Sequence, residues 1–424
     1  MAKPPRTPWQ PLLSGTSAAE GWEVVESIAG SLRGVSSAND DPSLAAGAAG
    51  RALFFAYRAA ASGDRREESL AERELDRAIA AIAERPMSPD LFGGFTGVAF
   101  AFEHLQGRRP ELADDEANEP VDDALGQLLG RSRWAGDFDL VSGLAGHGVY
   151  ALERLQHPSG AANLGRVVAR LAELSEPRPP GVTWRSRPEF LPPAERDLFP
   201  RGHFNLGVAH GVPAVAAILA GACAADVSAA IARPLLDRTM DWLWANQAQE
   251  HAASGFPCWV SEDAPPKPAR AAWCYGDPGV AATLYAASRA VGSADWERRA
   301  LELGRAAATR AVEQSGVRDA GLCHGAAGLL HLYNRLWQGS QDEVFANAAR
   351  HWVSTTLSMR RPLHGVAGYQ AWSRGAEGNE PTWRDDRSLL TGVVGIGLAL
   401  LAAISPVEPE WDRMLLASLP RGAS

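Results

Sequence analysis

The stretch GLCHGAAGLLHLY (321–333) holds a Gly-x-x-Gly turn directly before a run of apolar residues. The same order, a glycine turn followed by an apolar run, occurs seven times along the chain, and a recurring unit of this length indicates a repeat architecture. The first glycines of the turns stand 47 to 68 residues apart, at Gly47, Gly94, Gly143, Gly211, Gly276, Gly325 and Gly392. Only the fourth turn departs from the pattern, because Ala214 replaces its second glycine.

The segments between these apolar runs carry many charges and one apolar stripe, as in 293–315, where Ala300, Leu303 and Ala307 recur at helical spacing. One charged helix, one glycine turn and one apolar, buried helix make an α-hairpin. An open solenoid needs atypical repeats at its ends, whereas here the first and last turns resemble the others. We therefore predict an all-α fold, a closed α/α toroid (barrel) of seven inner and seven outer helices. Where seven helices begin around one axis, we expect backbones to crowd, which favours residues without a Cβ.

The proline-rich segment 175–203 interrupts the helical pattern. Long loops of this kind are often functional, and we expect a loop or small insertion over the site, with a short strand at GVTW (181–184). The remaining organisation is predicted to be a flexible N-terminal segment, 1–18, and a single toroid domain, 19–424. No dehydratase or kinase-like region precedes residue 19, which favours a stand-alone enzyme.

The composition of the 424 residues, 46% hydrophobic and 21% charged, is typical of a soluble globular protein. A net charge of −9 argues against nucleic acid as a partner. We find no signal peptide and no apolar run long enough for a transmembrane helix. Four cysteines in a chain of this length do not make a disulfide scaffold, so a reduced, cytoplasmic protein is expected.

Two adjacent turns carry residues that suit a metal ion. Cys274 precedes the fifth turn, and Cys323 and His324 precede the sixth, so a closed ring would bring them together. Two thiolates and an imidazole suit tetrahedral Zn²⁺, and three protein ligands leave a fourth position open, as in catalytic sites. Because two thiolates already balance the ion's charge, an incoming thiolate would stay electron-rich. Cys223 and Cys258 lack such placement and are interpreted as packing residues.

Other polar residues stand at related positions. His210 comes directly before the fourth glycine, Asp139 lies four residues before Gly143, and Arg270 lies four residues before Cys274. Together they could manage one proton and a developing oxyanion. Structural alternatives stay open: His210 bonded to backbone at a helix start, Asp139 as a helix cap, and Arg270 as a surface charge.

The motifs WCYGDPG (273–279), CHGAAG (323–328), NLGVAHG (205–211) and DLVSGLAG (139–146) resemble those of the lanthionine synthetase C-like family, which includes the cyclases of lanthipeptide biosynthesis. The resemblance implies an α/α toroid with one zinc ion. It also implies Michael addition of peptide cysteines to dehydroalanine or dehydrobutyrine, which forms (methyl)lanthionine thioether rings. By motif, the zinc ligands would be Cys274, Cys323 and His324. His210 would be the acid or base and Asp139 its partner, with Arg270 and Tyr275 lining the site.

The implied partner is a dehydrated precursor peptide with its leader, together with a dehydratase and transporter complex. One alternative is an enzyme of the same family that adds glutathione to dehydroamino acids in proteins. Another is a non-catalytic, zinc-containing peptide-binding protein with His210 as a fourth ligand. A third is a glycosidase, for which Asp90 and Asp139 lack a facing acid–base pair and the cysteines have no explanation.

Overall fold

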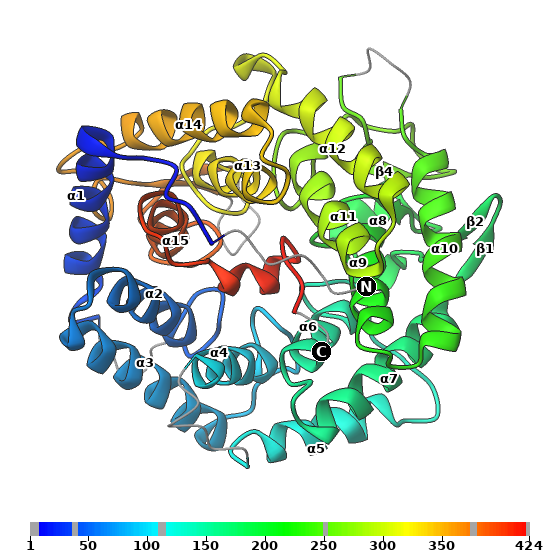
Figure 1. Cartoon of the computed structure of the whole chain (residues 1–424). Coiled ribbons are helices and arrows are strands. Elements are labelled where there is room, and N and C mark those ends of the chain that lie inside the picture. Colours follow the sequence, from blue (N-terminus) through cyan, green and yellow to red (C-terminus); the bar gives the residue numbers. More distant parts are fainter. Residues whose placement is uncertain (1–7, 36–40, 109–115, 249–252, 374–379, 421–424) are drawn as a thin grey trace.

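The computed structural model describes residues 8–35, 41–108, 116–248, 253–373 and 380–420, which form two concentric rings of helices (Figure 1). The inner ring consists of α2 (Ala48–Ser62), α4 (Phe95–Gly107), α6 (Leu144–Glu153), α9 (Val212–Ala224), α11 (Asp277–Val291), α13 (Ala326–Ser340) and α15 (Val393–Ile404). The outer ring consists of α1 (Gly15–Leu32), α3 (Arg65–Glu84), α5 (Glu119–Leu129), α7 (Pro158–Leu174), α10 (Ala229–Ala245), α12 (Ala294–Ala308) and α14 (Glu343–Ser358). The prediction of a toroid with seven inner and seven outer helices is confirmed.

The inner ring is closed, because each inner helix contacts the next and α15 contacts both α13 and α2. Each inner helix packs against the outer helix that follows it in the chain, except α15, which packs against α1. The seventh hairpin is therefore formed by α15, the last α-helix, and α1, the first. Inner helices are buried on every side, as all twelve residues of α15 are, whereas α12 buries only Ala300, Leu303, Gly304 and Ala307.

The N-terminal residues reach this last hairpin. The indole Nε1 of Trp9 donates to the carbonyl of Ala402 at 2.8 Å, and the backbone of Leu12 donates to Ala403 at 2.8 Å. Trp9 is only 7% exposed, and α1 begins at Gly15. The structure therefore differs from the expected flexible segment 1–18 in residues 8–18, because this segment must cross α15 to deliver α1; residues 1–7 lie outside the described residues.

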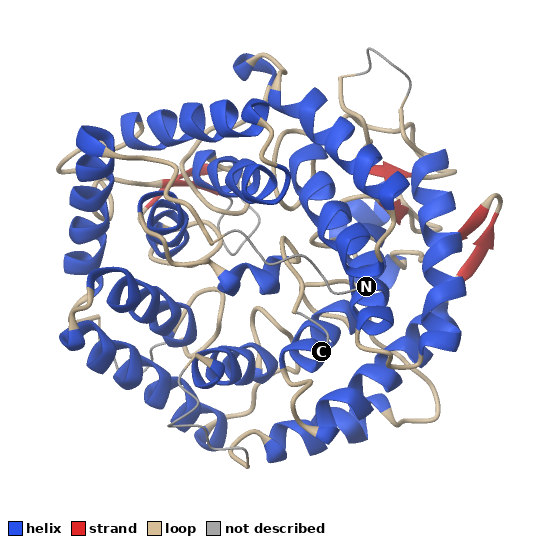
Figure 2. Ribbon diagram, in the orientation of Figure 1, coloured by secondary structure: helices blue, strands red, loops and turns tan. Residues whose placement is uncertain are grey.

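Strands occur only as short antiparallel pairs within the described chain (Figure 2). The pairs are β1 (Glu176–Arg178) with β2 (Gly181–Thr183), β3 (Phe204–Asn205) with β4 (Trp259–Val260), and β5 (Ala371–Ser373) with β6 (Thr382–Arg384). The segment 175–203 contains the first pair, the 3-10 turn η2 (Pro188–Phe190) and the short helix α8 (Pro193–Leu198). Arg187 of this segment donates to the carbonyl of Gly136 at 3.0 Å, which ties it to the loop before the third glycine turn.

The glycine turns are crowded by their own loops. Gly276 has a φ of +151°, and a Cβ there would lie 2.0 Å from the carbonyl oxygen of Arg270. A Cβ at Gly279, the second glycine of the same turn, would lie 2.2 Å from the carbonyl oxygen of Trp273. At this turn the close approach is therefore to the preceding backbone of the same loop, and not among helix starts as the sequence suggested.

Backbone hydrogen bonds connect neighbouring turns around the ring. The N–H of a residue just before one turn donates to the carbonyl before an adjacent turn, in the pairs Ala45–Phe92, Leu140–Ala209, Ala209–Cys274, Cys274–Cys323, Cys323–Leu390 and Leu389–Ala45. These bonds range from 2.7 to 3.3 Å. They fix the position of one turn relative to the next, and hence the position of any side chains that the turns carry.

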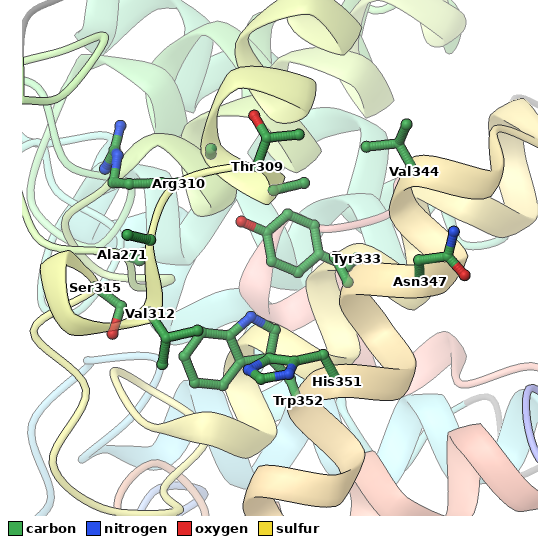
Figure 3. A pocket seen from close by; sticks show the side chains of 14 residues that line it. Ala271, Thr309, Arg310, Val312, Ser315, Tyr333, Val344, Asn347, His351 and Trp352 are labelled. Atoms are coloured by element: carbon green, nitrogen blue, oxygen red, sulfur yellow. The ribbon is translucent and has the colours of Figure 1, made fainter.

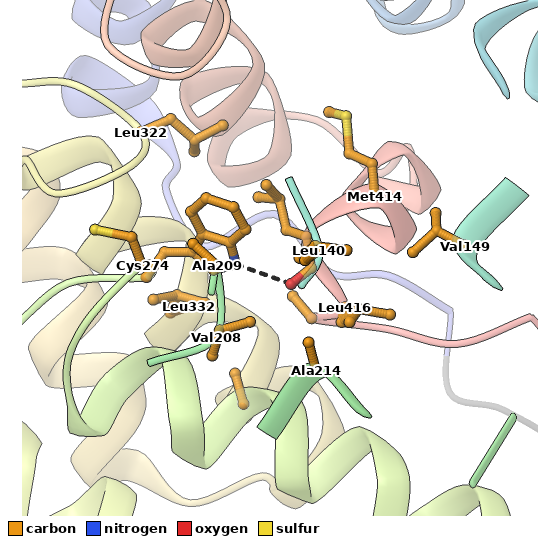
Figure 4. Close-up of a cluster of buried hydrophobic side chains, with 14 of the residues drawn as sticks. Leu140, Val149, Val208, Ala209, Ala214, Cys274, Leu322, Leu332, Met414 and Leu416 are labelled. Carbon is orange, nitrogen blue, oxygen red and sulfur yellow. Dashed lines mark hydrogen bonds between the residues drawn. The ribbon is translucent and has the colours of Figure 1, made fainter. Parts of the chain in front are cut away.

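The bore of the ring is filled by the C-terminal segment, whose 3-10 helix η4 (Glu410–Leu415) lies at the centre of Figure 1. Asp412 is fully buried and accepts two hydrogen bonds from Arg335 of α13, at 2.8 and 3.0 Å. Trp273 donates from its indole to the carbonyl of Leu415 at 2.8 Å, within the apolar cluster of Figure 4. The segment after α15 thus supports the turn that carries Cys274.

No helix in the described parts of the chain is long and apolar enough to cross a membrane.

Candidate metal centre and its neighbours

The three predicted metal ligands meet at the turns before α11 and α13. The ligand atoms of Cys274, Cys323 and His324 all lie within 4.8 Å of one another. The two cysteines occupy corresponding positions, two residues before the first glycine of adjacent turns, and the N–H of Cys274 donates to the carbonyl of Cys323 at 3.3 Å. Ring closure therefore brings together residues that are 49 positions apart in the sequence.

This donor set fits a zinc ion. Tetrahedral coordination with Zn–S near 2.3 Å and Zn–N near 2.0 Å requires ligand atoms about 3.5–4 Å apart. The Nδ1 atom of His324 is buried without a hydrogen-bond partner, which a native structure rarely leaves unexplained. A hydrogen bond from Cys323 lowers the pKa of Cys274, with help from His324 and Arg270, while the same bond raises the pKa of Cys323. A dication bound by both sulfurs would keep both thiols deprotonated.

His210 and Asp139 form a hydrogen-bonded pair beside this cluster. Nδ1 of His210 lies 2.5 Å from Oδ2 of Asp139, and the side chains are 45% and 4% exposed. A carboxylate can only accept, so Nδ1 carries the proton and Nε2 of the neutral imidazole can accept another. Burial alone would lower the pKa of His210, but the hydrogen bond and charge of Asp139 outweigh it and raise the pKa.

Asp139 also holds its own loop. Its Oδ1 accepts from the backbone N–H of Ser142 at 2.8 Å and from the Ser142 hydroxyl at 3.2 Å. Asp139 therefore fills both roles: Oδ1 accepts from its own loop, as a helix cap would, and Oδ2 pairs with His210. His210 lies outside the group formed by Cys274, Cys323 and His324 in the described residues, so the fourth-ligand alternative has no support from the geometry.

The remaining predicted residues flank the cysteines. Nη2 of Arg270 lies 3.9 Å from the sulfur of Cys274. The ring of Tyr275 lies 6.2 Å from the ring of His210, centroid to centroid, and its hydroxyl accepts from Nδ2 of Asn205 at 2.7 Å. Burial raises the pKa of Tyr275, so the phenol stays protonated at neutral pH.

Sequence reasoning missed two polar residues here. Asp137 lies next to the His210–Asp139 pair, and burial together with the charge of Asp139 raises its pKa to about 6. Asn205 begins the motif NLGVAHG, yet no role was assigned to it. A signal was available, because an Asp or Asn stands six residues before the first glycine in several turns and accepts from the backbone two residues on, in the pairs Asp41–Ser43, Asn205–Gly207, Asp319–Gly321 and Asp386–Ser388.

A cavity of about 370 Å³ lies elsewhere, between α12, α13 and α14 (Figure 3). Thr309, Tyr333 and Trp352 are among its lining residues, and none of the predicted ligands or of the four residues expected beside them lines it. The candidate metal centre is therefore not part of this cavity.

The closed ring of hairpins and the cysteine–histidine cluster on its turns define an α/α toroid with a candidate thiolate metal centre. A family model described as lanthionine synthetase C-like protein matches residues 38–416, and the chain belongs to this family. Nisin cyclase has a similar structure, with 17% sequence identity, a TM-score of 0.74, and coverage of 93% of this chain and 97% of that one. A cellobiose 2-epimerase from Bacillus thermoamylovorans matches with 11% identity and a TM-score of 0.47, over 92% and 99% of the two chains.

Proposed function

We propose that this protein is a zinc-dependent lanthipeptide cyclase, which closes (methyl)lanthionine rings in a dehydrated precursor peptide. The observation that carries the proposal is the meeting of Cys274, Cys323 and His324 beside the His210–Asp139 pair. Zinc bound by the two thiolates and the imidazole would hold a substrate cysteine as an electron-rich thiolate. Family membership and the fold shared with nisin cyclase support this assignment.

In the proposed reaction His210 first accepts a proton from the substrate thiol and later donates it to Cα of the dehydroamino acid. Nε2 is free to take the proton of the substrate thiol, because Asp139 keeps the other proton on Nδ1. The thiolate sulfur then bonds to Cβ of the dehydroamino acid, and the electron pair of the Cα–Cβ double bond moves onto the carbonyl as an enolate. The imidazolium, stabilised by the buried Asp139, returns the proton to Cα, so the product is an isomer of the substrate.

Arg270 supplies positive charge on the same side of the cluster. Its guanidinium lies 3.9 Å from the sulfur of Cys274, where it would offset the negative charge of three sulfurs around one dication. Segment 175–203 is proposed to lie over the site, since Arg187 ties it to the loop that carries Asp139. The further partners are a dehydratase and a transporter complex, in the cytoplasm.

The test uses a dehydrated peptide made with and without its own cysteine, incubated with the enzyme in the presence and absence of glutathione. Ring closure leaves the mass unchanged but removes one alkylatable thiol per ring, which mass spectrometry after alkylation measures. We expect thiol loss only with the cysteine-containing peptide, and its abolition by a chelator with recovery on adding Zn²⁺. Glutathione adducts on the cysteine-free peptide would favour the glutathione-adding alternative, and zinc binding without either product would favour a binding protein.

A further inference from the structure

Asn205, in the turn before α9, hydrogen-bonds through its side-chain amide to the hydroxyl of Tyr275, and the orientation of this amide is fixed. The backbone N–H of Gly207 donates to one end of the Asn205 amide at 2.9 Å. A backbone N–H can only donate, so this end is the oxygen, and the NH₂ group must face Tyr275. Asn205 is buried, with 2% of its surface exposed, so water does not compete for the hydrogen bonds of its amide.

A second contact supports the same orientation. Nδ2 of Asn205 also lies 3.5 Å from Nε2 of His203, a longer contact that needs an acceptor on the histidine. His203 is buried against Phe199 and Trp259, and burial lowers its pKa to about 4, so the ring is neutral and Nε2 can accept. Both N–H groups of Asn205 and its oxygen are then engaged.

The consequence concerns the direction of the 2.7 Å bond between Asn205 and Tyr275. Because the amide donates, the tyrosine hydroxyl accepts, and its own proton remains for another acceptor. Among the described residues the hydroxyl has no further hydrogen bond. The ring itself is held by close packing, since a Cβ at Gly207 would lie 2.7 Å from Cδ1 of Tyr275 and 2.4 Å from the carbonyl oxygen of Cys274.

We infer that Asn205 is a positioning residue that holds the Tyr275 hydroxyl as a hydrogen-bond donor to the substrate oxygen that becomes negative as the sulfur–carbon bond forms. The inference rests on the proposed cyclase reaction. Tyr275 follows Cys274 directly and lies beside His210, so its hydroxyl and the imidazole belong to one site. Tyr275 transfers no proton in this step; the proton delivered to Cα comes from His210.

Two variants remove the donated hydrogen bond in different ways. Asn205→Asp keeps an oxygen for Gly207 but replaces the NH₂ group by a second acceptor, so the Tyr275 hydroxyl turns to donate to it. Tyr275→Phe removes the hydroxyl. We expect each to lower kcat by about 100-fold, as loss of one oxyanion donor does, with the zinc content unchanged and the fold retained. The carboxylate that Asn205→Asp buries should lower the thermal unfolding temperature. Asn246→Asp, the same chemical change at the residue that follows the outer helix α10, is the matched control and should keep wild-type kcat.

The double variant shows whether the two residues act as one unit. We expect Asn205→Asp combined with Tyr275→Phe to be no slower than Tyr275→Phe alone, because the amide acts through the hydroxyl. Losses that multiply, or an Asn205→Asp enzyme with wild-type kcat, would overturn the inference.

A measurement without substrate separates this inference from the cyclase assignment. The UV resonance Raman difference between wild type and Tyr275→Phe isolates the Tyr275 signal, and the tyrosine doublet intensities report whether the hydroxyl donates or accepts. We expect an acceptor in the wild type and a donor in Asn205→Asp. A donor signal in the wild type would refute the bond direction, whereas a wild type that closes no rings would refute only the proposed reaction and leave the spectrum to decide the orientation.

Discussion

Replacing Asp139 by Asn tests the acid–base pair with little change in shape. In Asp139→Asn the amide oxygen can keep both bonds from Ser142, which leaves the NH₂ group facing His210 in place of Oδ2. An NH₂ group donates, so Nδ1 of His210 must become the acceptor and the single ring proton moves to Nε2. The neutral imidazole then cannot take a proton at Nε2, the atom proposed to accept it from the substrate thiol.

The expected loss in kcat is about 10²- to 10⁴-fold, the range that a positioned general acid or base contributes. We expect Asp139→Asn to change the free energy of unfolding much less than it changes the free energy of activation. A buried, charge-assisted hydrogen bond contributes about 1.5–3 kcal/mol. The His210 side chain is 45% exposed, so solvent screening reduces this and we expect at most about 1 kcal/mol. The variant should therefore be folded and zinc-loaded but slow.

The stability that the His210–Asp139 pair contributes depends on pH with a defined sign. Asp139 raises the pKa of His210 in the folded protein, so the stabilisation from this pair is full below the unfolded value, about 6.5, and disappears as the pH rises through the folded value. In Asp139→Asn burial is left to lower the pKa of His210, so the loss of stability with rising pH should no longer be seen. NMR titration of the His210 imidazole and denaturant unfolding at several pH values measure both effects.

Asp90→Asn is the matched control, because Asp90 stands four residues before Gly94 as Asp139 stands before Gly143. Its carboxylate accepts from the Ser88 hydroxyl at 2.8 Å, and it makes no hydrogen bond to a histidine within the described residues. We expect wild-type ring closure from this control. Rapid cyclisation by Asp139→Asn, or an unchanged His210 titration, would refute the assignment of the pair as the acid–base machinery.

Three further predictions follow from the site and its support. Cys274→Ala should abolish zinc binding and cyclisation with the helices intact, while Cys223→Ala changes neither; metal analysis and circular dichroism check this, and activity in the zinc-free variant would contradict it. His210→Ala should keep one zinc ion per chain and lose about 10²- to 10⁴-fold in kcat, so normal ring formation would remove His210 from the mechanism. Asp412→Ala removes the carboxylate that accepts from Arg335 in the bore, while Arg335 keeps Glu408 at 3.0 Å, and should destabilise the fold by about 3 kcal/mol, which denaturant unfolding measures; a change below about 1 kcal/mol would show that η4 is not held by this pair.

The sequence was sufficient to predict the toroid because its information is periodic. Each of the seven turns repeats a local pattern of glycines and apolar residues, and each unit needs the next one to cover its apolar helix. The same periodicity placed Cys274 and Cys323 at equivalent positions of adjacent turns, which predicted their proximity. It could not predict that the N-terminal residues pack on α15, since that contact depends on the two ends of the chain meeting when the ring closes.

The amino-acid sequence by itself therefore determined the number of hairpins, the closed ring and the identity of the cysteine–histidine cluster. Only the tertiary structure decided which oxygen of Asp139 faces His210, how Asn205 is oriented towards Tyr275, and that the C-terminal segment fills the bore beneath Trp273. The physical reason is the separation of the partners along the chain. Helices and turns follow from neighbouring residues, whereas the hydrogen-bonded pairs Asn205–Tyr275, His210–Asp139 and Trp273–Leu415 join residues 70 or more positions apart.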